Sequence, residues 1–280
     1  MAFWQTIFKK KLPDSTALDV PAKKTRSRVA LVLGGGGARG YGHVGAIRAF
    51  EEEGINFDFC VGTSVGSLIG ALYAAGIASE QMIAHSSTLE LKDIHSGFLF
   101  RQGDPFKIGK VVTDIVGDIL IEDLKKPFYA VAVDLVEAKQ VLFDRGSVAL
   151  AVSASACVPG VFRPIVHGSQ HLVDGGLLNN IPAETAKMLG ADKVVTVDIN
   201  PTRGGGTKGL GLIDIIKAMI SIMGANSSQN GLRFTDVLVA PNLEKFSASK
   251  KDGYAEMIEL GYQAAKEQTG NIKKLFELAE

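Results

Sequence analysis

FDFCVGTSVGSLIGALYAAG, residues 57–76, carries the clearest structural signal in the chain. Its first part, 57–61, is mostly apolar and aromatic, as expected of a buried strand. A tight turn with a glycine at each end follows over 62–66. Residues 67–75 are apolar and rich in alanine up to Gly76, which is typical of a helix and its C-terminal stop. Strand, turn and helix in this order are the unit from which parallel sheets are built.

Similar signals recur on both sides of this stretch. Further strands are predicted at 29–33, 128–133, 141–143, 194–199 and 236–240, and further helices at 40–53, 147–157, 212–223 and 252–280. The strand at 141–143 is expected to pair antiparallel with its predecessor. The alternation of strands and helices elsewhere predicts an α/β fold, with a parallel sheet and helices on both of its faces.

The helix at 212–223 has an unusual pattern. It is apolar except for a narrow stripe formed by Asp214, Lys217 and Ser221. This pattern predicts a helix buried on most of its sides. A lid, a dimer contact or a lipid contact is the functional alternative.

The composition excludes several classes of protein. The 32 glycines have no three-residue period and come with nine prolines, which excludes collagen. The 30 basic and 30 acidic side chains balance, so no nucleic acid partner is expected. Cys60 and Cys157 stand alone in apolar surroundings, which predicts buried thiols rather than a disulfide or a zinc site. No metal-ligand cluster and no apolar run of roughly 18 residues is visible, so we expect no metal and no membrane span.

Residues 1–27 differ from the rest of the chain. Aromatic residues near the start are followed by Lys9, Lys10 and Lys11, and residues 1–28 carry seven basic and two acidic side chains. This combination favours the headgroup layer of a membrane, with a helix packed on the domain or an unstructured tail as the alternatives. We therefore divide the chain into a tail over 1–27 and one domain over 28–280. The tail does not have the order of a secretion signal, so we expect a cytoplasmic protein with peripheral membrane contact as a hypothesis.

The turn at 62–66 carries the strongest chemical signal. Gly62, Ser64 and Gly66 form a Gly-x-Ser-x-Gly pattern between the predicted strand and helix. Small flanking residues let a serine nucleophile project from a sharp turn, and the Val65 N–H at the helix start then faces the reacting oxygen. The alternative is a structural turn in which Ser64 or Thr63 caps the helix.

The run of glycines at 34–40, GGGGARG, follows the first predicted strand. One interpretation is a phosphate or dinucleotide loop, although no Gly-Lys-Ser/Thr follows and no convincing acidic residue ends the next strand. The second is an oxyanion hole formed by the N–H groups of Gly36, Gly37 and Ala38 beside the Ser64 turn. A purely structural turn is the third.

A serine nucleophile needs a base. None of the five histidines follows residue 171, so the order serine, acid, histidine cannot be built with Asp174. Asp174 stands between an apolar strand and two glycines, where poor solvation would raise its pKa and make it a better base. An Asx turn closed by Gly175 is the structural alternative. Among the histidines, His43 is the best placed, beside the glycine loop.

These segments together resemble the patatin-like phospholipase family. The resemblance rests on four blocks that occur in the family's order, at 35–40, 62–66, 154–164 and 174–176. It covers about residues 28–240, and the compact chain is similar to the bacterial branch related to the catalytic domain of neuropathy target esterase. The resemblance implies a three-layer α/β/α sandwich with a mostly parallel central sheet.

The resemblance also implies roles for individual residues. Ser64 would be the nucleophile and Asp174 the base of a Ser–Asp dyad that cleaves acyl esters of lipids. The N–H groups of Gly36, Gly37 and Ala38 would form the oxyanion hole, with Arg39 holding the loop.

The sequence therefore predicts a serine acyl hydrolase acting on phospholipids or lysophospholipids through an acyl-enzyme, without a cofactor. Two alternatives keep the same fold. In one, an alcohol replaces water and the protein is an acyltransferase. In the other, the protein binds lipids or partners without catalysis. The pattern does not indicate an oligomeric state, a headgroup or a chain length.

Overall fold

The computed structural model describes residues 26–86, 103–200, 211–248 and 252–277. The described strands are β1 (Val29–Leu33), β2 (Phe59–Thr63), β3 (Phe128–Asp134), β4 (Lys139–Phe143), β5 (Ile165–His167), β6 (Gln170–Asp174), β7 (Lys193–Val197) and β8 (Val237–Val239). The α-helices are α1 (Tyr41–Glu52), α2 (Val65–Ala75), α3 (Ser79–Ser86), α4 (Phe106–Val116), α5 (Val148–Ser155), α6 (Gly176–Asn179), α7 (Ala183–Met188), α8 (Leu212–Leu232), α9 (Tyr254–Lys266) and α10 (Thr269–Leu275). Within the described ranges, short 3₁₀ turns also lie at Gly37–Gly40 and Ile121–Asp123.

The strands form one mixed sheet in the order β5-β6-β3-β2-β1-β7-β8, with β4 also paired to β3. Its centre is parallel, since β3, β2, β1, β7 and β8 all run in one direction. The edge beyond β3 is antiparallel, because β4 and β6 pair antiparallel with β3, and β5 with β6. The predicted α/β fold with a mostly parallel central sheet is confirmed, and so is the antiparallel pairing of 141–143.

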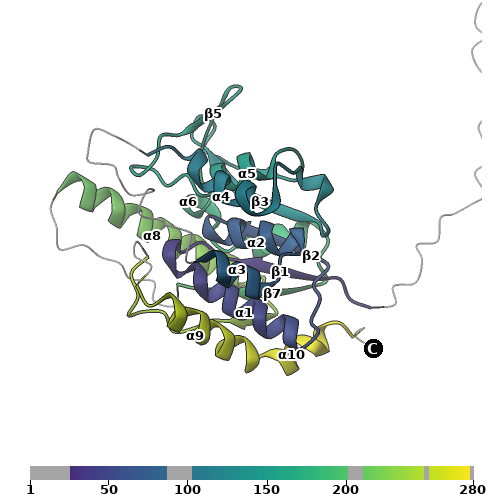
Figure 1. Cartoon of the computed structure of the whole chain (residues 1–280). Helices are drawn as coiled ribbons and strands as arrows, with labels where there is room; N and C mark the ends of the chain where they lie inside the picture. The colour runs from purple at the N-terminus through teal and green to yellow at the C-terminus, as the bar shows by residue number, and fades with distance from the viewer. Residues whose placement is uncertain (1–25, 87–102, 201–210, 249–251, 278–280) are drawn as a thin grey trace, which may run out of the picture.

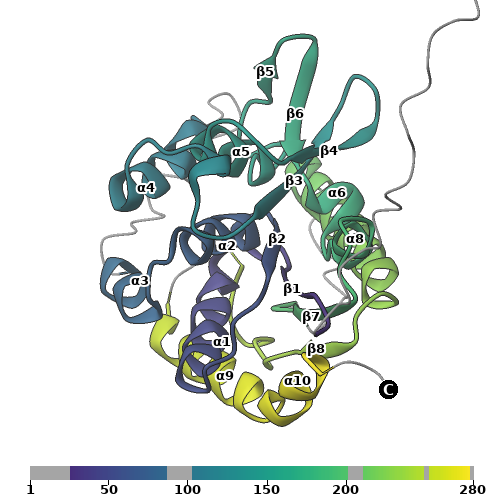
Figure 2. The ribbon, with the colours of Figure 1, turned by 90° about the vertical axis from the view of Figure 1, so that its right-hand side faces the viewer.

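Helices cover both faces of this sheet, as the alternation of side chains along a buried strand requires. On β1, Val29, Leu31 and Leu33 belong to a core shared with α1, α2 and α9. Ala30 and Val32 belong to a second core, shared with α7. Figure 2 shows α1 and α2 on one side of β1 and β2, and α6 and α8 on the other. The predicted three-layer α/β/α arrangement is therefore confirmed.

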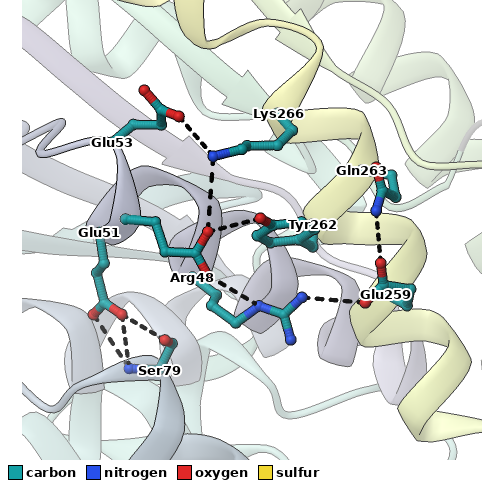
Figure 3. Close-up of polar contacts among 9 residues, drawn as sticks. Arg48, Glu51, Glu53, Ser79, Glu259, Tyr262, Gln263 and Lys266 are labelled. Atoms are coloured by element: carbon teal, nitrogen blue, oxygen red, sulfur yellow. Dashed lines mark hydrogen bonds and ion pairs between the residues drawn. The ribbon is translucent and has the colours of Figure 1, made fainter.

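Helices α1 and α9 lie side by side although about 200 residues separate them in the chain (Figure 1). They approach so closely that a Cβ at Gly45 would lie 1.8 Å from the Ile258 carbonyl oxygen, and one at Gly261 would lie 2.0 Å from the Gly42 carbonyl oxygen. Figure 3 shows the polar contacts along this pair, including the Arg48 guanidinium, which donates to Glu259 over 3.1 Å. The C-terminal segment therefore closes the domain, as two helices rather than the single one predicted.

Several predicted boundaries differ from the structure. Strand β2 begins at Phe59 rather than at 57, because the Asp58 carboxylate before it accepts bonds from Arg26 and from the Val29 N–H. Two residues of the expected tail contact the domain. Arg26 pairs with Asp58, and Ser27 is buried and donates to the Glu277 carbonyl, so these two residues belong to the domain. Residues 1–25 lie outside the described ranges.

The prediction that 212–223 is buried on most sides is wrong for the side chains that the structure describes. Ile215, Met219, Ile222 and Met223 are all exposed, at 44%, 56%, 63% and 39%. The helix continues to Leu232 and docks through its second half, where small residues allow a close approach. Ser227 and Ser228 are buried there, and a Cβ at Gly231 would lie 1.9 Å from the Ile181 carbonyl oxygen.

Candidate active site

Ser64 stands at the turn between β2 and α2, in a backbone conformation that side chains rarely adopt. Its φ is 55° and its ψ is −128°. The two flanking glycines are required by space. A Cβ at Gly62 would lie 2.5 Å from the Gly66 carbonyl oxygen, and a Cβ at Gly66 would lie 2.1 Å from the Leu33 carbonyl oxygen. This geometry is that of a strained turn that projects a serine above a parallel sheet.

Asp174 lies directly beside Ser64. The Ser64 hydroxyl donates to Asp174 Oδ2 over 2.7 Å, and the Gly176 N–H donates to Asp174 Oδ1 over 2.8 Å. Both side chains are buried, with 8% and 7% of their surfaces exposed. Burial raises the pKa of Asp174 to about 6, although the bonds from Ser64 and Gly176 act against this. The carboxyl group therefore titrates close to neutral pH.

The sheet register brings these two residues together along one edge of β3. Thr63, the residue before Ser64, pairs with Val131, and Asp174 pairs with the next residue of β3, Ala132. Because β4 occupies the other edge of β3 along Ala130–Asp134, β2 and β6 follow one another on the same edge, and Ser64 and Asp174 meet where the two strands end. This arrangement depends on β6 running antiparallel to β3, which the sequence analysis did not predict.

Ser155 is a buried residue of this site that the sequence analysis missed. The Ser64 N–H donates to Ser155 Oγ over 2.9 Å, and the Ser155 hydroxyl donates to the Val131 carbonyl over 2.7 Å. It therefore ties the strained turn to β3. Ser155 lies within the block at 154–164, but nothing in a serine near the end of a helix indicates which turn it will hold.

The glycine loop lies against the Ser64 turn, since a Cβ at Gly35 would lie 3.1 Å from Ser64 Cβ. Within the described ranges, the N–H groups of Gly36, Gly37 and Val65 have no hydrogen-bond acceptor. The Ala38 N–H differs, because it donates to the Ala248 carbonyl over 2.7 Å. The Ala38 N–H is therefore already used in this structure, and its predicted role as an oxyanion donor stays a prediction.

Arg39 connects the glycine loop to two other segments. Its Nε donates to the Phe246 carbonyl over 2.9 Å, and its Nη1 donates to Asn200 Oδ1 over 2.9 Å. Asn200 in turn donates to the Gly35 carbonyl over 2.6 Å. Burial lowers the pKa of Arg39. These contacts are of the kind expected of a residue that holds the loop.

His43 contacts the start of the glycine loop and does not serve Ser64 as a base in this structure. Its Nε2 lies 2.8 Å from the Gly34 carbonyl oxygen, and burial lowers its pKa to about 4. The imidazole is therefore neutral at pH 7. Cys60 and Cys157 are free and buried, as predicted, and burial raises the pKa of Cys157 to about 12.

In the described ranges, no three His, Cys, Asp or Glu side chains form a group that could hold a metal ion. In the same ranges, no helix combines the length and the apolar character that crossing a membrane requires.

Comparison with known proteins gives the family. A family model described as "Patatin-like phospholipase" matches residues 31–187, which include Ser64 and Asp174. The chain belongs to the patatin-like phospholipase family. The resemblance drawn from the four sequence blocks is therefore confirmed.

Relatives of this patatin-like chain agree with that assignment. It is 37% identical over 201 residues to an uncharacterised NTE family protein of Mycobacterium bovis, covering 69% of this chain and 55% of the relative. It is 34% identical over 193 residues to patatin-like phospholipase domain-containing protein 6 of Mus musculus, covering 62% of this chain and 14% of that protein. The chain thus spans about half the length of the mycobacterial relative.

The crystal structure of VipD from Legionella pneumophila has the same fold. It superposes with a TM-score of 0.62 at 14% identity, covering 88% of this chain and 67% of that one. At this identity the likeness concerns the fold alone.

Proposed function

We propose that the protein is a serine acyl hydrolase that cleaves fatty-acyl esters of phospholipids or lysophospholipids with a Ser64–Asp174 dyad. The observation that carries the proposal is the 2.7 Å hydrogen bond from the hydroxyl of Ser64, in its strained turn, to a buried carboxyl group. The raised pKa of Asp174 supports it, because a base that titrates near neutral pH accepts a proton more readily than an ordinary carboxylate.

The reaction follows from this arrangement in two halves. In the first, the Ser64 proton passes to Asp174 as Ser64 Oγ bonds to the ester carbonyl carbon. Asp174 then returns the proton to the departing alcohol oxygen as the ester C–O bond breaks, which leaves an acyl-serine. In the second half, water gives its proton to Asp174 and attacks the acyl-serine. The fatty acid leaves and Ser64 is reprotonated.

The negative charge that forms on the carbonyl oxygen needs donors that are not already in use. The N–H groups of Gly36, Gly37 and Val65 meet this requirement, and the Val65 N–H also begins α2, whose dipole favours negative charge. The position of the glycine loop against Ser64 favours this role over nucleotide binding. We therefore assign the oxyanion hole to these three groups.

Labelling with a fluorophosphonate tests the mechanism. The wild-type protein should be labelled at Ser64, Ser64→Ala should not react, and Asp174→Asn should react at least tenfold more slowly. Labelling of Ser64→Ala at the wild-type rate, or no labelling of the wild-type protein, would contradict the proposed dyad. The products separate a hydrolase from an acyltransferase. With a lysophospholipid as substrate, a hydrolase releases free fatty acid as its main product.

The proposal includes the division of the chain into a tail and a hydrolase domain over 28–280, with peripheral membrane contact through the tail. Because Arg26 and Ser27 make contacts with the domain, a deletion that tests the tail should stop at residue 25.

A further inference from the structure

Asn180 stands directly after α6, where the glycine loop and α8 come together. Its main-chain N–H donates to Ser227 Oγ over 3.1 Å, and its main-chain carbonyl accepts from the Gly35 N–H over 3.2 Å. Its side-chain Nδ2 donates to Ser228 Oγ over 2.9 Å. Asn180 is only 8% exposed, and α6 and α8 lie side by side (Figure 2). The residue is therefore fixed between the glycine loop and the docked half of α8.

The fourth polar group of Asn180, its side-chain oxygen, has no such partner. Within the described ranges, Asn180 Oδ1 accepts no hydrogen bond from another residue. A largely buried acceptor in this state costs free energy unless a donor reaches it. Asn180 Oδ1 is therefore available to a small ligand that carries an O–H group.

This oxygen lies close to the dyad, and two glycines leave the space around it open. A Cβ at Gly35 would lie 2.5 Å from Asn180 Oδ1 and 3.1 Å from Ser64 Cβ. A Cβ at Gly176 would lie 3.0 Å from Asn180 Oδ1 and 3.1 Å from Asp174 Oδ1. The oxygens of Asn180 and Asp174 are therefore no more than about 6 Å apart, within reach of one bridging water molecule. A side chain at either glycine would crowd this space.

We propose that Asn180 Oδ1 binds the water molecule that hydrolyses the acyl-serine. The inference rests on the proposed hydrolase function and adds a catalytic residue to the second half of the reaction. One O–H group of the water gives its proton to Asp174 as the water oxygen bonds to the acyl carbon. The other O–H group donates a hydrogen bond to Asn180 Oδ1 and keeps its proton. The bond from the acyl carbon to Ser64 Oγ then breaks, the proton passes from Asp174 to Ser64 Oγ, and the fatty acid leaves.

The same contact selects water over alcohols as the acyl acceptor. An alcohol has a single O–H group, so it cannot donate to Asp174 and to Asn180 at the same time. Its alkyl group would leave Asn180 Oδ1 without a donor, which carries the cost of an unpaired buried acceptor. Asn180 therefore favours hydrolysis of the acyl-enzyme over transfer of the acyl group to an alcohol.

The test measures how the acyl-enzyme divides between water and methanol. Asn180→Leu removes the acceptor with little change in size, and Asn180→Ala is its smaller counterpart. In both variants, hydrolysis of the acyl-serine should slow about tenfold, the effect of losing one hydrogen bond. Fluorophosphonate labelling of Ser64, which reports the first half of the reaction, should stay within about threefold of wild type. With a p-nitrophenyl ester and methanol, the ratio of methyl ester to free fatty acid should rise about tenfold.

Two further variants act as controls. Asn179→Leu is the matched one, because Asn179 Nδ2 donates to Gln140 and Thr185 over 2.7 and 3.0 Å. It loses hydrogen bonds of the same kind but should keep the wild-type product ratio. Asn180→Asp tests the acceptor itself, since a carboxylate accepts hydrogen bonds and has no N–H to donate. At about pH 9 its product ratio should equal that of wild type.

The outcomes separate this inference from the proposed function. If wild-type protein hydrolyses no ester and does not react with a fluorophosphonate, the proposed function fails, and this inference fails with it. If wild-type protein is active but Asn180→Leu and Asn180→Ala keep its product ratio, Asn180 does not hold the water and the dyad stands. A rise in Asn179→Leu or Asn180→Asp as large as that in Asn180→Leu would also overturn the inference. Because both products come from one acyl-enzyme, their ratio does not depend on the amount of folded protein.

Discussion

Replacing Asp174 by asparagine should remove activity and, above about pH 6, stabilise the protein. Burial raises the pKa of this carboxyl group from its ordinary 3.8 to about 6. Between these two values the folded protein binds more protons at Asp174 than the unfolded chain does. Stability is therefore lost as pH rises from about 4 to about 6, because the folded protein must then hold a charged group that is poorly solvated.

The magnitude follows from the same pKa. A pKa of about 6 instead of 3.8 corresponds to about 3 kcal/mol, since each tenfold change in proton affinity is worth about 1.4 kcal/mol. Asparagine has nearly the same shape, and its side-chain oxygen can accept the Gly176 N–H, but it carries no charge. The free energy of unfolding of Asp174→Asn relative to wild type should therefore increase by about 2–3 kcal/mol between pH 4 and pH 8.

Urea unfolding followed by circular dichroism at several pH values measures this difference. Ser64→Ala is the control, because it also removes activity but keeps the buried carboxyl group. Since it loses the hydroxyl that lowers the pKa of Asp174, its stability should depend on pH at least as strongly as that of wild type. In parallel, kcat/KM of wild-type protein for a water-soluble ester should fall as pH drops through about 6. A stability difference between Asp174→Asn and wild type that does not change with pH would refute the reasoning, as would an acid limb of activity near pH 4.

Three further predictions concern the support of the site, the closure of the domain and the tail. Ser155→Ala leaves the buried N–H of Ser64 and the buried Val131 carbonyl unpaired, so stability should fall by about 1–3 kcal/mol for each of these two groups. Because the nucleophile is then displaced, kcat should fall about 100-fold. Ser153→Ala, on the same helix with its bond directed to α4, should lose stability in urea unfolding without a comparable loss of kcat. Gly261→Ala should destabilise the α1–α9 contact by about 1–3 kcal/mol in thermal unfolding, whereas Gly270→Ala, which meets open space, should be neutral or slightly stabilising; equal effects would argue against the close contact. Deleting residues 1–25 should reduce sedimentation with anionic vesicles and leave hydrolysis of a water-soluble ester unchanged; unaltered vesicle binding would remove the membrane hypothesis.

Much of the fold could be predicted because its signals are local. Strand β1 coincides with the predicted 29–33, and α2 ends at Ala75, directly before Gly76, where φ is 77°. The strained turn at Ser64 was also predictable, since the strand before it, the two glycines and the helix after it are neighbours in the chain. Such signals arise from the period of buried side chains and from the space around the backbone, and both are written in consecutive residues.

Predictions from local sequence patterns failed where a segment is in contact with residues that are distant in the chain. The prediction for 212–223 assumed that an apolar stripe is a buried stripe, but α8 docks through Ser227 and Ser228 beyond it, while Met219 and Ile222 stay exposed. Small polar residues carry no hydrophobic periodicity, so this contact left no signal. The bond from the Ala38 N–H to the Ala248 carbonyl could not be predicted for a similar reason, since Ala248 lies over 200 residues later in the chain.

The pairing of Ser64 with Asp174 likewise has a part that the sequence determines and a part that only the tertiary structure decides. A reactive serine and a poorly solvated acid could each be identified from the residues around them, and the family resemblance paired them. Their 2.7 Å contact, however, depends on the antiparallel entry of β6 and on the register that sets Asp174 opposite Ala132. Hydrogen bonds between strands join backbone groups common to almost all residues, so the register is set by packing in the assembled sheet rather than by any residue in the strand.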